Sequence, residues 1–323
     1  MLLGRPYGPS GSPWRPLFDP EKCMADPQTL SFADALEGDR ADRAAFASAL
    51  VQSLKDTGFV ILIDHGIDLT RLNDVYETVA AFFAQAEDDK ARFIVGRDGQ
   101  RGYTPFGRES AKDTAIPDLK EFWHVGREAV APNVWPDHPP AFRSEISWLY
   151  EALDATGHGL LAALEEGLGV GAGDLTRLAE GGNSVLRLLH YPPVTATAPP
   201  GSLRAAAHED INLITLLVAA SAEGLELLSR DGEWRAIDAP PDALIVDSGD
   251  MLARLTNGFL PATTHRVVRP RTVNRSRYSL PYFLHPRPDA LLACLDGFRD
   301  GSEAPPILAA DFLAQRLAAI GLT

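Results

Sequence analysis

The sequence predicts a mainly β fold with flanking helices, of the sandwich or jelly-roll type. Three observations support this class. Short apolar runs separated by Gly, Pro and Asp turns fill residues 185–284, which is typical of sandwiches and jelly rolls. Longer stretches with helical spacing of apolar residues precede them. One further stretch of that kind follows near the C-terminus, so the β core is expected to carry helices on both sides.

The N-terminal segment, residues 1–26, is rich in Pro and Gly and is expected to form a flexible arm. Residues 41–57 are expected to form a helix, because Phe46, Leu50 and Leu54 recur at four-residue spacing. Gly58 is placed to end that helix, and residues 59–63 (FVILI) read as a buried strand. A second helix is expected at residues 69–84.

Residues 118–126 (DLKEFWHVG) end in alternating side chains, which predicts a strand. His124 in that strand is either part of a pocket wall or an ordinary strand residue, and the sequence does not choose between them. A long amphipathic helix is expected at residues 144–168, where five leucines form one apolar face, and a short helix at 174–179.

The β core is divided by its turn residues into a series of short strands. These are expected at residues 185–191, 208–218, 225–228, 234–237, 243–246, 251–255, 265–268 and 278–284. A C-terminal helix at 309–320 would close the barrel or support a contact between subunits. The chain is thus expected to divide into the arm, an N-terminal helical and strand region (27–180), a β-strand core (181–290) and a C-terminal helical segment (291–323).

Composition limits the classes of partner. The formal net charge is −14, which disfavours nucleic acid and anionic membrane surfaces, because binding phosphate backbones needs a basic stripe. No apolar run is long enough for a membrane span or a signal peptide, and two cysteines, Cys23 and Cys294, are too few for a disulfide framework. We therefore expect a cytoplasmic protein with a small-molecule substrate. The oligomeric state is not determined by the sequence.

Three residues have the chemistry of a metal site. His208 and Asp210 are two apart, so in a strand they would project from the same face. His265, from a distant strand, could complete a set of two imidazoles and one carboxylate. Such a set leaves other coordination positions open and is the arrangement that holds non-haem Fe(II) for oxygen chemistry.

Two further residues could anchor an anionic ligand beside that metal. Arg277 and Ser279 are again two apart in an expected strand. A guanidinium binds a carboxylate through two parallel hydrogen bonds, and a hydroxyl beside it adds a third donor.

These motifs together resemble the isopenicillin N synthase-like family of Fe(II)-dependent oxygenases. The pattern His208-Glu209-Asp210, His265 and Arg277-Tyr278-Ser279 matches that family in order and spacing, as do Tyr191-Pro192-Pro193 and Gly249-Asp250. The resemblance implies a double-stranded β-helix (jelly-roll) core with an N-terminal helical region. It implies that His208, Asp210 and His265 bind Fe(II), that Arg277 and Ser279 bind the distal carboxylate of 2-oxoglutarate, and that Tyr191 contacts the same ligand. The reaction would consume O₂.

Three functional hypotheses remain open at this point. The first is a 2-oxoglutarate-dependent oxygenase that hydroxylates, desaturates or cyclises a small metabolite, such as an amino acid, a peptide or a natural-product intermediate, and releases succinate and CO₂. The second is a 2-oxoglutarate-independent Fe(II) oxidase of the isopenicillin N synthase type. The third is a non-catalytic ligand-binding protein on the same fold.

Overall fold

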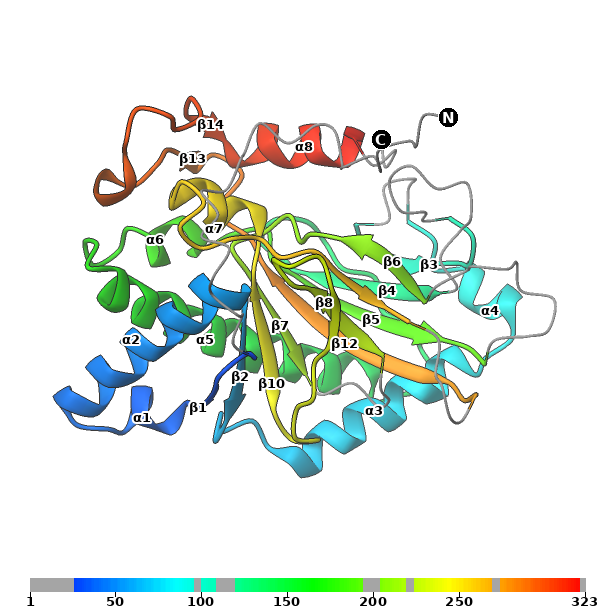
Figure 1. Cartoon of the computed structure of the whole chain (residues 1–323). Coiled ribbons are helices and arrows are strands. Elements are labelled where there is room, and N and C mark those ends of the chain that lie inside the picture. The colour runs from blue at the N-terminus through cyan, green and yellow to red at the C-terminus, as the bar shows by residue number, and fades with distance from the viewer. Residues whose placement is uncertain are drawn as a thin grey trace, which may run out of the picture.

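A computed structural model describes residues 26–95, 100–108, 120–193, 204–218, 224–268 and 274–319. Two facing sheets form its centre, and helices cover the outer face of the larger one (Figure 1). Of the expected arm, residues 1–26, only Asp26 belongs to the described residues. Cys23 lies outside them. No helix in the described ranges is long and apolar enough to cross a membrane.

The helices lie mainly in the N-terminal half. Their bounds are α1 (Ala33–Leu36), α2 (Arg40–Thr57), α3 (Leu69–Phe83), α4 (Glu87–Ala91), α5 (Phe142–Leu168), α6 (Thr176–Ala179), α7 (Asp250–Leu255) and α8 (Ala309–Ala319), with a short 3₁₀ helix at Asp296–Phe298. The expected helices of the N-terminal half and the C-terminal helix are confirmed to within a few residues. Gly58 ends α2 with a φ of 74°, a left-handed conformation that glycine adopts without a steric penalty.

The larger sheet has eight strands in the order β1-β2-β10-β7-β12-β5-β4-β3. Their bounds are β1 (Thr29–Ser31), β2 (Phe59–Ile63), β3 (Gly102–Thr104), β4 (Glu121–Gly126), β5 (Val185–Tyr191), β7 (Ile214–Val218), β10 (Leu244–Ser248) and β12 (Arg277–Leu284). Strands from the N-terminal region thus extend both edges of this sheet, which is a continuous hydrogen-bonded unit. The expected division of the chain at residues 180 and 290 stays a prediction.

The smaller sheet has four strands in the order β6-β11-β8-β9. They are β6 (Ala205–His208), β8 (Leu225–Leu228), β9 (Trp234–Ala236) and β11 (His265–Val267), and a separate pair, β13 (Leu291–Leu292) and β14 (Ile307–Leu308), precedes α8. Two facing, largely antiparallel sheets with N-terminal helices are the architecture of a double-stranded β-helix, so the expected fold class is confirmed.

Two expected strands are wrong. The expected strand 208–218 is two strands, β6 and β7, joined by a connecting segment at residues 209–213, because the chain crosses there from the smaller sheet to the larger one. The expected strand 251–255 is the helix α7. Its apolar residues Met251, Leu252 and Leu255 are buried at helical spacing, which a six-residue window does not distinguish from a strand.

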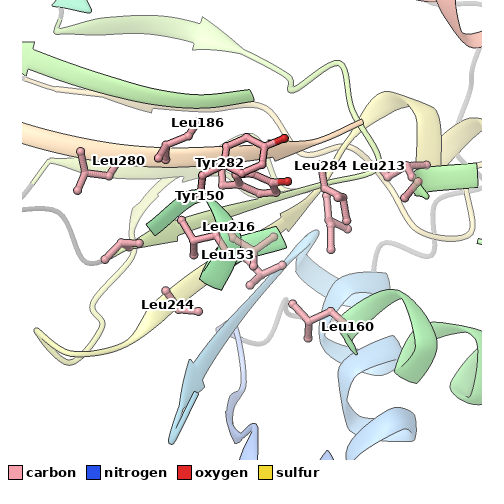
Figure 2. Close-up of a cluster of buried hydrophobic side chains, with 14 of the residues drawn as sticks. Tyr150, Leu153, Leu160, Leu186, Leu213, Leu216, Leu244, Leu280, Tyr282 and Leu284 are labelled. Carbon is pink, nitrogen blue, oxygen red and sulfur yellow. The ribbon is translucent and has the colours of Figure 1, made fainter. Parts of the chain in front are cut away.

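Alternation along β12 explains how one strand serves both the core and a cavity. Leu280, Tyr282 and Leu284 face α5, and they pack there with side chains such as Leu153 and Leu160 (Figure 2). The intervening residues, Arg277, Ser279, Pro281 and Phe283, line the cavity on the other side of the sheet. The apolar face fixes the strand's register, and the register fixes which side chains reach the cavity.

Candidate active site

The cavity between the two sheets contains the six residues that were expected to bind the metal or the co-substrate. It is lined from the larger sheet by β2, β5, β7, β10 and β12, and from the smaller sheet by β6, β8 and β11. His208, Asp210, His265, Arg277, Ser279 and Tyr191 all line it. The structure therefore brings together six residues that are separated by up to 88 positions in the sequence.

The two histidines and the aspartate form a group that could hold a metal ion. Their ligand atoms lie within 4.8 Å of one another, and among the described residues this is the one such group of three or more His, Cys, Asp or Glu. The Nε2 atoms of His208 and His265 lie 3.7 and 3.8 Å from the same oxygen, Oδ1 of Asp210. His208 ends β6 and His265 begins β11, and the two residues are paired across the strands.

Backbone carbonyls orient both imidazoles. Nδ1 of His208 lies 2.7 Å from the carbonyl oxygen of Ala206, and Nδ1 of His265 lies 3.2 Å from that of Thr263. Because a carbonyl only accepts, each Nδ1 carries the hydrogen, which leaves the Nε2 lone pair of a neutral ring directed toward Asp210. Desolvation, with the nearby His265, lowers the pKa of His208, although 43% of its side-chain surface is exposed. Two imidazoles that each present Nε2, together with one carboxylate, fit the donor set of an Fe(II) centre.

Asp210 reaches this position from a loop, not from the strand that the sequence predicted. Its backbone oxygen accepts a hydrogen bond from the Asp250 N–H at 2.8 Å, at the start of α7. Gly249 makes this approach possible, because a Cβ atom there would overlap the backbone carbonyl of Asn212. The Gly249-Asp250 motif therefore fastens the metal-site loop to the end of β10. The prediction that His208 and Asp210 lie on one strand face is therefore wrong, although their side chains do lie close together as it expected.

A buried polar cluster surrounds the far oxygen of Asp210. Thr215 Oγ1 donates to Oδ2 of Asp210 and accepts a hydrogen bond from Nδ2 of Asn212 at 2.8 Å. Although burial opposes it, the two imidazoles and the Thr215 hydroxyl bring the pKa of Asp210 below its ordinary value. Asp247 lies beside this group on β10, where burial and the charge of Asp210 raise its pKa well above the usual range. Sequence reasoning did not single out Asp247.

Arg277 and Tyr191 lie opposite each other in the pairing of β12 with β5. The guanidinium carbon of Arg277 lies 5.1 Å from the centre of the Tyr191 ring. Arg277 is 1% exposed, and burial lowers its pKa. A buried guanidinium is costly in desolvation, and an anion in the cavity would offset that cost. Ser279 lies two residues along the same strand face, as the motif predicted.

Three other cations near this site were missed by sequence reasoning. Lys120 and Arg187 line the cavity. Arg204 is fully buried, and its pKa is lowered by burial and, to a smaller extent, by the positive charge of Arg277. Isolated Lys and Arg residues form no motif, and only the pairing of the strands shows which of them face inward. Alternation along β5 was the available signal for Arg187, since it shares a face with Leu189 and Tyr191.

A larger cavity, of about 640 Å³, lies elsewhere and contains none of these groups. It is lined by residues of α5, α7 and the segment that includes Cys294 and the 3₁₀ helix. The chemistry of the side chains, and not the size of the cavity, identifies the candidate active site.

Comparison with known proteins agrees with this geometry. Residues 182–286 match the family model of the 2OG-Fe(II) oxygenase superfamily, and residues 29–138 match that of the non-haem dioxygenase in morphine synthesis N-terminal region. A 2-oxoglutarate-dependent dioxygenase of an Acremonium species, ucsF, is 30% identical over 90% of this chain and 93% of its own length.

Solved structures agree as well. A 2OG-Fe(II) oxygenase family protein from Caulobacter crescentus is 41% identical and superposes with a TM-score of 0.81, covering 92% of this chain and 99% of its own. A full-length Neurospora crassa protein, solved in complex with alpha-KG and thymine, is 29% identical with a TM-score of 0.84, covering 91% and 96% of the two chains. This chain belongs to the 2OG-Fe(II) oxygenase superfamily.

Membership of this superfamily makes the protein an Fe(II)- and 2-oxoglutarate-dependent dioxygenase, whose cofactors are Fe(II) and 2-oxoglutarate. Relatives in the superfamily bind small molecules, as the thymine complex of the Neurospora crassa protein illustrates. The cofactor assignment favours the first of the three hypotheses over the 2-oxoglutarate-independent oxidase and the non-catalytic binder.

Proposed function

We propose that His208, Asp210 and His265 hold the Fe(II) ion and that Arg277, Ser279 and Tyr191 hold 2-oxoglutarate. The substrate is a small metabolite, which is hydroxylated, desaturated or cyclised at a C–H bond. The observation that carries this proposal is the position of one Asp210 oxygen, 3.7 and 3.8 Å from the Nε2 atoms of the two imidazoles, in the cavity that Arg277 lines.

The protein's own residues bind, orient and exclude water. When bound, Fe(II) with O₂ and 2-oxoglutarate supplies the oxidation, in which 2-oxoglutarate is converted to succinate and CO₂. Arg277 pairs with the distal carboxylate through a two-pronged contact, and Ser279 donates to the same group. Tyr191 fixes the plane of the guanidinium from across the strand pair. Apolar residues such as Leu217, Ile245 and Phe283 line the cavity and limit the access of water.

The test of the co-substrate site is Arg277→Gln. A hydrogen bond to a charged group contributes about 1.5–3 kcal/mol, so 2-oxoglutarate affinity should fall by about ten- to a hundredfold. Arg277→Lys should recover only part of it, because an ammonium does not reproduce the two-pronged geometry. Calorimetric titration of the Mn(II)-loaded protein with 2-oxoglutarate measures the affinity, and succinate release measures turnover. Unchanged 2-oxoglutarate affinity in Arg277→Gln would contradict the assignment.

The test of the metal site is Asp210→Ala, with His208→Ala and His265→Ala as companions. Each variant should stay folded and lose Fe(II) binding, measured by metal content after dialysis, together with 2-oxoglutarate turnover. Asp289→Ala, an exposed carboxylate outside the cavity, is the control and should retain the metal. Full metal content in Asp210→Ala would show that the ion is held elsewhere.

A further inference from the structure

The C-terminal helix α8 lies beside the short helix α7 and contacts it at two points (Figure 1). The guanidinium carbon of Arg254, near the end of α7, lies 5.6 Å from the centre of the Phe312 ring on α8. Four residues further along α8, a guanidinium nitrogen of Arg316 forms an ion pair with Asp250, the first residue of α7. The two helices therefore run in opposite directions where they meet.

Arg316 also contacts the segment that carries the proposed metal ligands. Its Nη2 atom lies 3.5 Å from Oε2 of Glu209, the residue between His208 and Asp210 in the sequence. The other oxygen of Glu209 accepts a hydrogen bond from the hydroxyl of Thr264 at 2.9 Å, and Thr264 directly precedes the third proposed ligand. Arg316 and Glu209 thus connect α8 to residues adjacent to all three proposed ligands.

Asp250 forms a second connection between Arg316 and Asp210. Its backbone N–H donates to the backbone oxygen of Asp210 at 2.8 Å, so the ion pair acts on a residue that fixes the main chain of a proposed ligand. The Asp250 side chain is 13% exposed, whereas that of Glu209 is 38% exposed. Water therefore screens the pair with Asp250 less than the pair with Glu209.

Like charges would gather at this junction without Arg316. Glu209 and Asp250 both adjoin Asp210, and the guanidinium of Arg316 contacts the first two of these carboxylates. Because like charges repel, loss of the cation would favour separation of Glu209 from Asp250. That movement would displace the segment between β6 and β7, where Asp210 lies.

We propose that Arg316 is a positioning residue for the metal site. By binding Glu209 and Asp250 at once, it holds the segment between β6 and β7 in the conformation that directs Asp210 at the ion. This inference rests on the proposed function, which places the ion at Asp210 and the two histidines. The C-terminal helix thereby contributes to the geometry of a site whose ligands it does not supply.

The test is Arg316→Met, which removes the charge and keeps an unbranched side chain of similar helix propensity. Affinity for Mn(II), measured by calorimetric titration, should fall by about threefold or more. Partners that contact a metal ligand directly commonly change affinity by about 10–100-fold, and Arg316 acts one step further away. Loss of a positive charge would by itself strengthen the binding of a dication, so the expected fall has the opposite sign to a simple field effect.

Two further variants separate positioning from folding and from net charge. Arg316→Lys keeps the positive charge and should recover part of the affinity. Arg299→Met is the matched control, because it removes one positive charge and an exposed ion pair with Asp296 outside the active-site cavity. It should bind Mn(II) as the parent does. Thermal unfolding of metal-free Arg316→Met should stay cooperative.

Several results would overturn the role of Arg316. They are a Mn(II) affinity of Arg316→Met that lies within threefold of the parent or above it, an equal loss in Arg299→Met, and no recovery in Arg316→Lys. Asp210→Ala reports separately on the proposed function. Metal retained in Asp210→Ala would refute the site itself, whereas metal lost there and bound normally by Arg316→Met would refute the positioning role alone.

Discussion

At Asp210, the two carboxylate oxygens have separate neighbours. Oδ1 faces the Nε2 atoms of both histidines, and Oδ2 accepts a hydrogen bond from Thr215. The hydroxyl has one hydrogen, which it gives to Asp210, and it accepts from the Asn212 amide. The carboxylate is therefore fixed in rotation by a residue of β7 before any ion binds. Partners of this kind beyond the ligands commonly change metal affinity by about 10–100-fold.

Thr215→Val tests this role, because it keeps the shape of the side chain and removes its hydroxyl. Affinity for Mn(II) should fall by about tenfold or more, measured by titration, while thermal unfolding of the metal-free protein stays cooperative. Thr156→Val is the matched control, since that hydroxyl donates to the helix carbonyl of Ala152 within α5. Equal metal affinities of Thr215→Val and the parent would mean that the hydroxyl does not orient Asp210.

The sequence identified the residues of the candidate site that belong to motifs and missed those that depend on strand pairing. His208, Asp210, His265, Arg277, Ser279 and Tyr191 were named in advance and meet in one cavity. Asp247 and Arg187 were not, because a single Asp or Arg in a strand indicates a site only when its facing direction is known. That direction follows from register, for example the pairing of Arg187 with His124, which the chain alone does not provide.

Among the elements, the longer helices and most of the short strands were predictable, whereas the crossing after His208 and the short helix α7 were not. The helices α2, α3 and α5 and the strand β2 were identified within about two residues, because apolar runs and helical periodicity mark them and Gly58 separates α2 from β2. The run after His208 was assigned to a single strand since apolar residues continue to Val218. The break at residues 209–213 arises from contacts with Gly249, Asp250 and Met251, which are distant in sequence.

The strand β4 shows how one element is fastened to the helical layer. Glu121, 1% exposed, accepts hydrogen bonds from Lys90 Nζ at 2.7 Å and from Tyr103 Oη at 2.5 Å, and its other oxygen lies 2.7 Å from Nδ1 of His190. Lys90 itself is 2% exposed, at the end of α4. This buried network joins α4, β3, β4 and β5 on the side of the sheet away from the cavity.

Glu121→Gln should destabilise the fold by about 3–5 kcal/mol, because the buried ammonium of Lys90 then keeps only the exposed Glu87 as a charged partner. Lys90→Met combined with Glu121→Gln should recover part of the loss, since no buried charge then remains. Glu87→Gln, on a carboxylate that is 63% exposed and also pairs with Lys90, should cost less than about 1 kcal/mol. Chemical denaturation measures all three. A loss in Glu121→Gln no larger than that in Glu87→Gln would show that the network contributes little.

The same network gives a pH dependence with a defined sign. Although burial opposes it, the contacts with His190, Lys90 and Tyr103 hold the pKa of Glu121 below its ordinary 4.5. The unfolded chain therefore takes up this proton at a higher pH than the folded one. The stabilisation by Glu121 is fully present above the unfolded pKa and is lost as pH falls through the folded value. Denaturation midpoints between pH 7 and pH 3 should fall more steeply in the parent than in Glu121→Gln, and parallel curves would contradict this.

For the molecule as a whole, the candidate site is built where two sheets and a loop meet. His208 and His265 belong to the smaller sheet, and Asp210 lies on the crossing segment that leads into β7 of the larger one. In the smaller sheet, β6 is an edge strand of four residues whose strand partner is β11. The fold class was predictable from the alternation of short strands, whereas this junction was not, because it depends on which strands share a sheet.

Such a junction couples ion binding to local unfolding. An opening that separates β6 from β11 also separates two of the proposed ligands, so it must release the ion. At a metal concentration a hundred times the dissociation constant, this opening becomes harder by about 2.7 kcal/mol. Hydrogen exchange at the amides of β6 and β11 should then slow by about a hundredfold on adding Mn(II), while amides in the exposed first turn of α2, far from the site, keep their rate. An equal rate in β6 with and without metal would mean that the strand separates from its neighbour without disturbing the ion.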